Sequence, residues 1–302
     1  MRVFVTGATG YIGSAVVREL LEASHQVLGL ARSDAAAARL ARASVEVHRG
    51  ALDDLNSLYD GARAADGVIQ LAFTNISETT DFAAACQADL RAVETIGAAL
   101  EGTGKPFVVT SGTAGLARLG LGRLATEEDV PDPAVPRVAS EYAAVALSRR
   151  GVRSSVVRLP LSVHGEGDHG FVPSLIGIAR AKGVSAFVGD GSNRWPAVHR
   201  LDAARLFRLA VEAAPAGSRL HGAGEEAVPF REIALAIGRQ LNLPIVSIEA
   251  SDAGDHFGFL APMVSADNPT SSATTRQLLG WQPQGPGLIE DIEQDHYFTH
   301  ER

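Results

Sequence analysis

Cysteine is nearly missing from this sequence: Cys86 is the only one, so no disulfide can form within the chain. Basic residues are in the minority, with 27 lysines and arginines against 35 aspartates and glutamates. The net charge of −8 argues against nucleic acid as a partner, because a phosphate backbone requires a basic face. Apolar runs are only as long as strands, so no membrane span is expected. The chain also enters its first apolar run without a basic or cleavable leader, and together these features favour a cytoplasmic protein.

What the sequence does contain is an alternation of short apolar stretches with helical stretches. Apolar residues make up 46% of the 302 residues, which is enough for a large core. The pattern predicts strands near residues 2–6, 26–30, 45–48, 67–71, 106–110 and 153–158. It predicts helices near residues 11–23, 34–42, 54–62, 82–101, 137–150, 172–182, 202–213, 230–241 and 288–297. This alternation indicates an α/β fold, with a parallel sheet covered by helices on both faces.

The most informative motif, Thr6-Gly7-Ala8-Thr9-Gly10-Tyr11-Ile12-Gly13, follows the first predicted strand and opens a predicted helix. Gly7 permits a tight turn, Gly10 lets the backbone approach a pyrophosphate, and Gly13 lets the helix pack close to the strand. The helix N-terminus offers free N–H groups and a partial positive charge to an anion. The loop therefore predicts a bound dinucleotide. The expected contacts come from Gly7, Thr9, Gly10, Tyr11, Ile12 and Gly13.

The G-x-x-G-x-x-G spacing resembles the short-chain dehydrogenase/reductase superfamily in its extended and atypical branches, those of the NAD(P)-dependent epimerases and dehydratases. Later motifs extend the resemblance over nearly the whole chain. It implies a Rossmann-type doubly wound parallel sheet with a smaller C-terminal substrate lobe. We expect a dinucleotide-binding domain over residues 1–163 and a substrate lobe over residues 164–302. Residues 198–214 and 244–250 are expected to return to the sheet.

The end of the second predicted strand bears on the choice of cofactor. NAD-selective sites place a carboxylate here for the ribose 2′-hydroxyl, whereas this chain has Arg32 and Ser33. An arginine can bind a 2′-phosphate through charge-assisted hydrogen bonds. We therefore expect NADP(H) to be favoured over NAD(H), although Asp34 lies close by.

The resemblance assigns further cofactor contacts to the ends of other strands. Gly50-Ala51-Leu52-Asp53 resembles the segment that caps the adenine, with Ala51 in place of its usual aspartate. Farther along the chain, the ends of the fourth, fifth and sixth predicted strands resemble the family's segments beside the nicotinamide. The implied contacts there are Leu71, Ala72, Phe73, Thr110, Ser111, Pro160 and Val163.

The catalytic pattern of the superfamily, a tyrosine and a lysine four residues apart on one helix, is broken here. Tyr142 is followed four residues later by Ala146, and it lies too near the sixth strand. Aligning Glu141 with the family's K-x-x-x-E glutamate instead places Arg137 at the lysine and Pro133 at the tyrosine. Arg137 can bind ribose hydroxyls but cannot titrate near neutral pH.

A proton donor must then come from another group. The candidates are Ser111, Thr113, His164 and His169, of which histidine is suited to proton transfer near neutral pH. The alternative for each histidine is a hydrogen-bonded loop residue without a catalytic role. We take Ser111, Arg137 and His164 as the catalytic candidates.

Gly189-Asp190-Gly191 and His199-x-x-Asp202 resemble a segment of the extended family, whose nucleotide-sugar epimerases have an arginine four residues before the histidine. This chain has Trp195 at that position, which argues against a nucleotide-sugar substrate. The alternative is that the adjacent Arg194 takes the role of that arginine, which keeps sugars as the minor option. Trp195 either forms an aromatic wall for a flat or apolar small molecule or packs at the lobe interface. The substrate-contact candidates are Thr113, His169, Phe171 and Trp195. No metal site is expected, because the spacing of His164, Asp168 and His169 fits no familiar motif.

The function that the resemblance implies is an NADP(H)-dependent oxidoreductase acting on a small carbonyl or alcohol substrate. The alternatives are an NADP(H)-binding redox sensor without turnover and, less favoured, an epimerase or dehydratase. Relatives often form homodimers through two helices, here near 82–101 and 137–150. Their alanine-rich faces either form such an interface or pack on the sheet.

Overall fold

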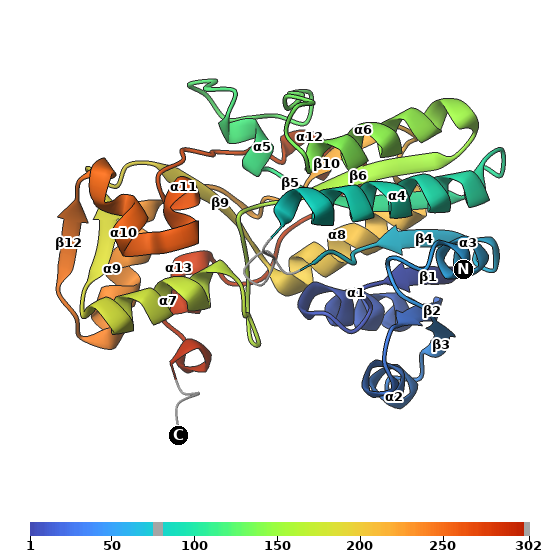
Figure 1. The fold of residues 1–302 in the computed structure, drawn as a ribbon, viewed down its shortest axis with the longest axis horizontal. Helices are drawn as coiled ribbons and strands as arrows, with labels where there is room; N and C mark the ends of the chain where they lie inside the picture. Colours follow the sequence, from blue (N-terminus) through green and yellow to red (C-terminus); the bar gives the residue numbers. More distant parts are fainter. Residues whose placement is uncertain (75–80, 299–302) are drawn as a thin grey trace.

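The computed structural model describes residues 1–74 and 81–298 and has two lobes, which lie end to end along its long axis (Figure 1). The larger lobe contains the N-terminus and a seven-stranded sheet. The smaller lobe is built from the later part of the chain.

The central sheet has the strand order β10-β6-β5-β4-β1-β2-β3, and all its neighbouring strands run parallel. Its strands are β1 (Arg2–Thr6), β2 (Gln26–Ala31), β3 (Glu46–Arg49), β4 (Gly67–Gln70), β5 (Pro106–Gly112), β6 (Arg153–Leu159) and β10 (Ser218–His221). Consecutive residues of β1, such as Val3, Phe4 and Val5, are all fully buried, as a parallel sheet covered on both faces requires. The predicted α/β, Rossmann-type fold is confirmed.

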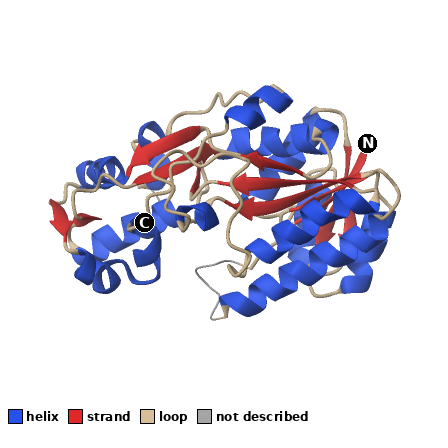
Figure 2. Cartoon of the chain, turned by 90° about the horizontal axis from the view of Figure 1, so that it is seen from above, coloured by secondary structure: helices blue, strands red, loops and turns tan. Residues whose placement is uncertain are grey.

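Two layers of helices cover this sheet (Figure 2). Val3 and Val5 point toward one layer and Phe4 toward the other, because successive side chains of a strand alternate between faces. The first layer contains α1 (Tyr11–Glu22), α2 (Asp34–Arg42) and α8 (Arg200–Ala213). The second contains α3 (Leu55–Arg63), α4 (Phe82–Leu100) and α6 (Val138–Ala146), which continues as a 3-10 turn at Leu147–Arg150. A short helix, α5 (Ala114–Ala117), follows β5.

The smaller lobe has its own apolar core, in which Trp195, Phe230 and Phe257 are buried. Its sheets join β7 (Ser162–His164), β9 (Arg194–His199) and β11 (Glu225–Pro229), and separately β8 (Ser185–Val188) and β12 (Ile245–Ile248). Its helices are α7 (Phe171–Lys182), α9 (Phe230–Leu241), α10 (Ala253–Phe257), α11 (Ala261–Val264), α12 (Ala273–Leu279) and α13 (Leu288–Ile292). Short 3-10 turns lie at Ala250–Asp252, Gly258–Leu260 and Asp295–Tyr297.

The chain returns from the smaller lobe to the central sheet through α8 and β10, which pairs with β6. The expected return of residues 244–250 is not observed, because β12 pairs in parallel with β8 instead. The physical reason is that β10 follows α8 after a short connection and already occupies the β6 edge. Strand β12 follows α9, and this helix links β12 to a parallel partner within the smaller lobe.

Across the described residues, no helix combines the length and apolarity needed to cross a membrane.

Candidate active site

The glycine-rich loop between β1 and α1 brings backbone atoms unusually close together. Gly7 has a φ of +68°, a left-handed conformation that favours glycine. A Cβ on Gly13 would lie 2.0 Å from the Gly7 carbonyl oxygen, and one on Gly7 would lie 2.8 Å from the Ala72 nitrogen. Helix α1 begins at Tyr11 with no acidic residue in its first turn, so its free N–H groups can meet an anion. The loop fits a dinucleotide diphosphate.

A cleft of about 370 Å³ runs from this loop along the carboxyl ends of the strands toward the smaller lobe. Many of the predicted site residues line it together: Gly7, Gly10, Tyr11, Ile12, Gly13, Leu71, Ala72, Phe73, Thr110, Val163, His169 and Phe171. These residues come from the ends of β1, β4 and β5, from β7 and from the loop that opens α7. Ligands of open parallel sheets bind at this edge.

The wall that follows β4 is held by polar side chains of neighbouring strands. The Thr6 hydroxyl oxygen accepts hydrogen bonds from the backbone N–H groups of Leu71 (3.2 Å) and Ala72 (3.1 Å). The Gln70 amide donates to the Ala72 carbonyl at 3.2 Å, and the Thr110 hydroxyl donates to the Gln70 carbonyl at 2.7 Å. The segment expected beside the nicotinamide therefore has a fixed backbone.

Arg32 lies exposed at the end of β2, where a cofactor 2′-substituent is expected, and Ser33 caps α2 by accepting from the Ala36 N–H (3.2 Å). Arg49 ends the adjacent strand β3, in register with Ala31, and its guanidinium lies 2.5 Å from an Asp34 oxygen. Arg49 was not predicted from the sequence as part of the cofactor site. The signal that could have found it is a basic residue at the end of the third predicted strand, next to the strand that ends before Arg32. Ala51 and Leu52 follow it, at the expected adenine side.

Arg137 lies at the N-terminus of α6, and its side chain contacts three partners. Its guanidinium pairs with Asp89 of α4, donates to the Thr110 carbonyl (2.8 Å) and covers the ring of Phe73 at 4.1 Å. Within the described part of the chain, the residues that line the cleft include Phe73 and Thr110 but not Arg137. The Tyr142 hydroxyl, farther along α6, donates to the Pro131 carbonyl at 3.2 Å. It is not among the described residues that line the cleft.

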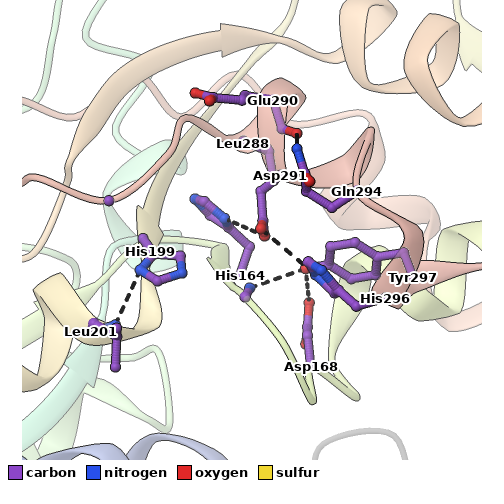
Figure 3. Close-up of polar contacts among 12 residues, drawn as sticks. His164, Asp168, His199, Leu201, Leu288, Glu290, Asp291, Gln294, His296 and Tyr297 are labelled. Atoms are coloured by element: carbon purple, nitrogen blue, oxygen red, sulfur yellow. Dashed lines mark hydrogen bonds and ion pairs between the residues drawn. The ribbon is translucent and has the colours of Figure 1, made fainter.

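His164 is buried at the junction with the C-terminal segment rather than along the cleft (Figure 3). Its Nδ1 lies 2.8 Å from an Asp291 oxygen of α13, which orients the ring. The neighbouring backbone N–H of Gly165 donates to the Tyr297 hydroxyl (3.2 Å), which itself donates to Asp168 at 3.0 Å. The C-terminal segment therefore holds the loop that begins at His164.

Thr9 of the glycine-rich loop is not among the described residues that line the cleft. Four predicted residues farther along the chain also lie away from the cleft surface. Thr113 is buried and accepts a hydrogen bond from the Asn268 amide at 3.0 Å. Trp195 is fully buried, donates to the Met263 carbonyl (3.0 Å) and packs with its ring centroid 5.0 Å from that of Phe230. It therefore lies within the core of the smaller lobe, rather than at a wall of the cleft or at the lobe interface. Ser111 and Pro160 are buried at the ends of β5 and β6.

Five further residues line the cleft although the sequence did not predict them there: Leu161, Ser162, Asp168, Gly170 and Ser174. Burial raises the pKa of the Asp168 carboxyl, against the opposing hydrogen bonds from the Gly170 N–H and the Tyr297 hydroxyl. Tyr11 donates to the Gly165 carbonyl at 3.2 Å, and its ring meets the His169 ring edge to face at 5.6 Å. Burial raises the pKa of Tyr11 as well, so its hydroxyl keeps its proton.

A metal site in the part of the chain that the structure describes would need several ligands close together. No group of three or more histidine, cysteine, aspartate or glutamate residues there is placed to hold an ion.

Comparison with known proteins places this geometry in a family. The chain is 48% identical over 299 residues to Uncharacterized protein C2A9.02 of Schizosaccharomyces pombe, covering 99% of this chain and 100% of the relative. It is 29% identical to the 2-alkyl-3-oxoalkanoate reductase of Stenotrophomonas maltophilia, covering 77% and 73% of the two chains. Its fold matches the dTDP-glucose 4,6-dehydratase DesIV of Streptomyces venezuelae, whose structure holds NAD, with a TM-score of 0.78 at 20% identity over 100% and 98% of the chains. The profile of the NAD dependent epimerase/dehydratase family matches residues 3–221, and the chain belongs to that family.

Proposed function

We propose that this protein is an NADP(H)-dependent oxidoreductase that interconverts a small carbonyl compound and its alcohol. The observation that carries the proposal is one continuous cleft that joins the glycine-rich loop to the segment after β4, to Thr110 of β5 and to the segment after β6. A protein that binds only the adenine half of a dinucleotide does not need the part of the cleft beyond the glycine-rich loop, where the nicotinamide is expected. The 2-alkyl-3-oxoalkanoate reductase among its relatives supports a carbonyl substrate.

The preference for NADP(H) is supported by charges at the end of β2 and β3. Arg32 is exposed there, and Arg49 pairs with the nearby Asp34 at 2.5 Å. The pairing offsets the one carboxylate that would repel a 2′-phosphate. Two guanidinium groups and one carboxylate leave a net positive charge for that phosphate.

The substrate end of the cleft favours an apolar molecule with few polar groups. Phe73, Leu161 and Phe171 contribute apolar surface, while Ser174 contributes a hydroxyl. Pockets for small ligands combine apolar walls with a few polar groups that fix orientation. We therefore expect ketones or aldehydes with an aliphatic or ring-shaped body.

The bound nicotinamide would supply or accept the hydride. Asp168 and His169 are the cleft-lining side chains suited to exchange the proton. Burial raises the pKa of Asp168, and an imidazole ring can both donate and accept a proton. Arg137 cannot exchange one, because its pKa is above about 12.

The first experiment is a fluorescence titration of the protein with NADPH and with NADH, followed by a screen of 3-oxo esters, ketones and aldehydes with NADPH. We expect micromolar NADPH binding, much weaker NADH binding and oxidation of NADPH by at least one compound class. Failure to bind either dinucleotide would refute the proposal.

The second candidate, an NADP(H) sensor without turnover, is favoured by one observation: α6 has no tyrosine–lysine pair facing the cleft. Tyr142 is bound to Pro131, and Ala146 occupies the position four residues later. Tight NADPH binding with no turnover across the whole screen would support this candidate over the first.

A further inference from the structure

A buried carboxylate on α4 lies behind the nicotinamide end of the cleft. Asp89 is fully buried, and its Oδ1 accepts a hydrogen bond from the Gln70 amide at 2.7 Å. Its Oδ2 accepts from the guanidinium of Arg137, which lies at the start of α6. A charge removed from water in this way is tolerated only when it is paired and hydrogen-bonded, so the three side chains form one unit.

The other edges of that guanidinium face the wall of the cleft. Arg137 donates to the Thr110 carbonyl at 2.8 Å, and the Phe73 ring packs on its face with 4.1 Å between the guanidinium carbon and the ring centroid. Thr110 and Phe73 both line the cleft. Because the guanidinium is a planar fork with fixed donor directions, fixing one edge fixes the other.

The side chain of Arg137 remains 18% exposed, so an outward route to water is open to it. Without the Asp89 charge, a cation at this depth gains more from solvent than from one carbonyl and one ring. The Thr110 carbonyl and the Phe73 ring would then lose their shared partner.

We infer that Asp89 is a positioning residue: through Arg137 it fixes Thr110 and Phe73, the two walls between which the nicotinamide end of the dinucleotide lies. The inference rests on the proposed function, since it presumes a dinucleotide in the cleft. It gives Arg137 a role in shaping the wall, and it ties α4 to the substrate end although Asp89 does not itself touch a ligand.

The binding test compares two ligands by calorimetry, NADPH and adenosine 2′,5′-bisphosphate, which has the adenine half and the 2′-phosphate but no nicotinamide. Asp89→Asn should weaken NADPH binding about tenfold or more, the usual size of one lost charge-assisted hydrogen bond. Binding of the bisphosphate should stay within about twofold. Arg137→Lys keeps the positive charge but loses the planar guanidinium with its two donor edges. It should likewise weaken NADPH binding and leave bisphosphate binding nearly unchanged.

Glu101→Gln is the matched control, because Glu101 ends α4 and pairs with Arg150 outside the cleft. It should bind both ligands as the wild type does. Unchanged NADPH binding in Asp89→Asn would overturn the inference. Equal weakening of the binding of both ligands would also overturn it, because a general loosening of the fold lowers both affinities.

A second measurement needs no ligand. In nitrogen-15 spectra of the arginine side chains, the terminal N–H groups of Arg137 should give separate signals, because one is bound to Asp89 and the other to the Thr110 carbonyl. The signals that disappear in Arg137→Lys are those of Arg137. In Asp89→Asn they should average into one signal, and an unchanged spectrum would contradict the positioning role. If the wild type binds no dinucleotide, the proposed function fails, and this spectrum alone decides whether Asp89 holds Arg137.

Discussion

The guanidinium of Arg49 lies 2.5 Å from a carboxylate oxygen of Asp34, at the edge of the sheet where Arg32 is exposed. Asp34 follows β2 and Arg49 ends β3, so the pair bridges the ends of two adjacent strands. Asp34 is almost fully exposed, and the pair therefore contributes little to stability. Its main effect is on the local charge, because the pair neutralises Asp34 where a cofactor 2′-phosphate would bind.

The first prediction concerns cofactor preference. Arg32→Asp should weaken NADPH binding by about tenfold or more and leave NADH binding nearly unchanged, because a 2′-phosphate then faces two carboxylates. Arg49→Ala should act in the same direction, since it leaves Asp34 uncompensated. Fluorescence titration with both dinucleotides measures the ratio. Arg239→Ala, which removes an arginine of α9 paired with Glu293, is the control. An unchanged ratio in Arg32→Asp would remove Arg32 from the 2′-phosphate site.

The second prediction concerns Tyr142. Its hydroxyl donates to the Pro131 carbonyl at 3.2 Å, so Tyr142→Phe should leave kcat nearly intact and affect only local packing. Steady-state kinetics with NADPH and any substrate found in the screen provide the measurement. A fall in kcat of about a hundredfold or more, the scale of a lost general acid, would refute this placement.

The third prediction concerns Trp195, which is fully buried in the core of the smaller lobe. Trp195→Ala should lower the free energy of unfolding by about 3–5 kcal/mol, because it leaves a large cavity and frees the Met263 carbonyl. Urea unfolding followed by circular dichroism gives the value. Phe259→Ala, at an exposed aromatic of the same lobe, should change it by about 0.5 kcal/mol or less. A substrate-specific defect with unchanged stability would instead place Trp195 at the ligand.

The fourth prediction concerns pH and the buried His221. Its Nδ1 lies 2.8 Å from the Ser271 carbonyl and must carry the proton, so its Nε2 accepts from Arg158 at 3.0 Å. Burial, together with the Arg158 charge, lowers the pKa of His221 from its usual 6.5 to about 4. The unfolded chain therefore takes up a proton at higher pH than the folded chain does.

Stability from this group is fully present above about pH 6.5 and is lost as the pH falls toward 4. The loss should approach about 3 kcal/mol, from the size of the pKa shift. His221→Gln keeps one donor and one acceptor but does not titrate. Urea unfolding at pH 7.5 and at pH 4.5 should therefore show a smaller difference for the variant, and equal differences would contradict the role of His221.

The glycine-rich loop and the strand ends could be predicted from sequence because each rests on local rules. Gly7, Gly10 and Gly13 follow an apolar run and precede a helical one, and this order is enough to fix a turn at the sheet edge. The smaller lobe was harder, because its strands are short. Residues 244–250 were expected to join the central sheet, but the apolar pattern of a short strand does not specify which strand it pairs with.

The buried polar contacts could not be predicted, because they depend on which helix faces meet. Asp89 is an ordinary helical aspartate by its sequence, and only the packing of α4 against α6 buries it beside Arg137. Likewise, Thr113 and Trp195 are plausible cleft residues by type, but the strands and loops that carry them turn these side chains into the interior. Whether a side chain points inward or toward a ligand is a tertiary property.

The order of elements along the chain has a consequence for dissecting the protein. Strand β10 borders β6 and α8 packs on α1, yet both follow the first elements of the smaller lobe, β7 to β9, in sequence. A fragment ending at residue 163 would bare the β6 edge and the apolar side of α1, and exposed strand edges promote aggregation. The shortest fragment that retains every strand of the central sheet ends at His221, which is also where the family profile ends. Modular exchange of substrate lobes between relatives would therefore require two junctions rather than one.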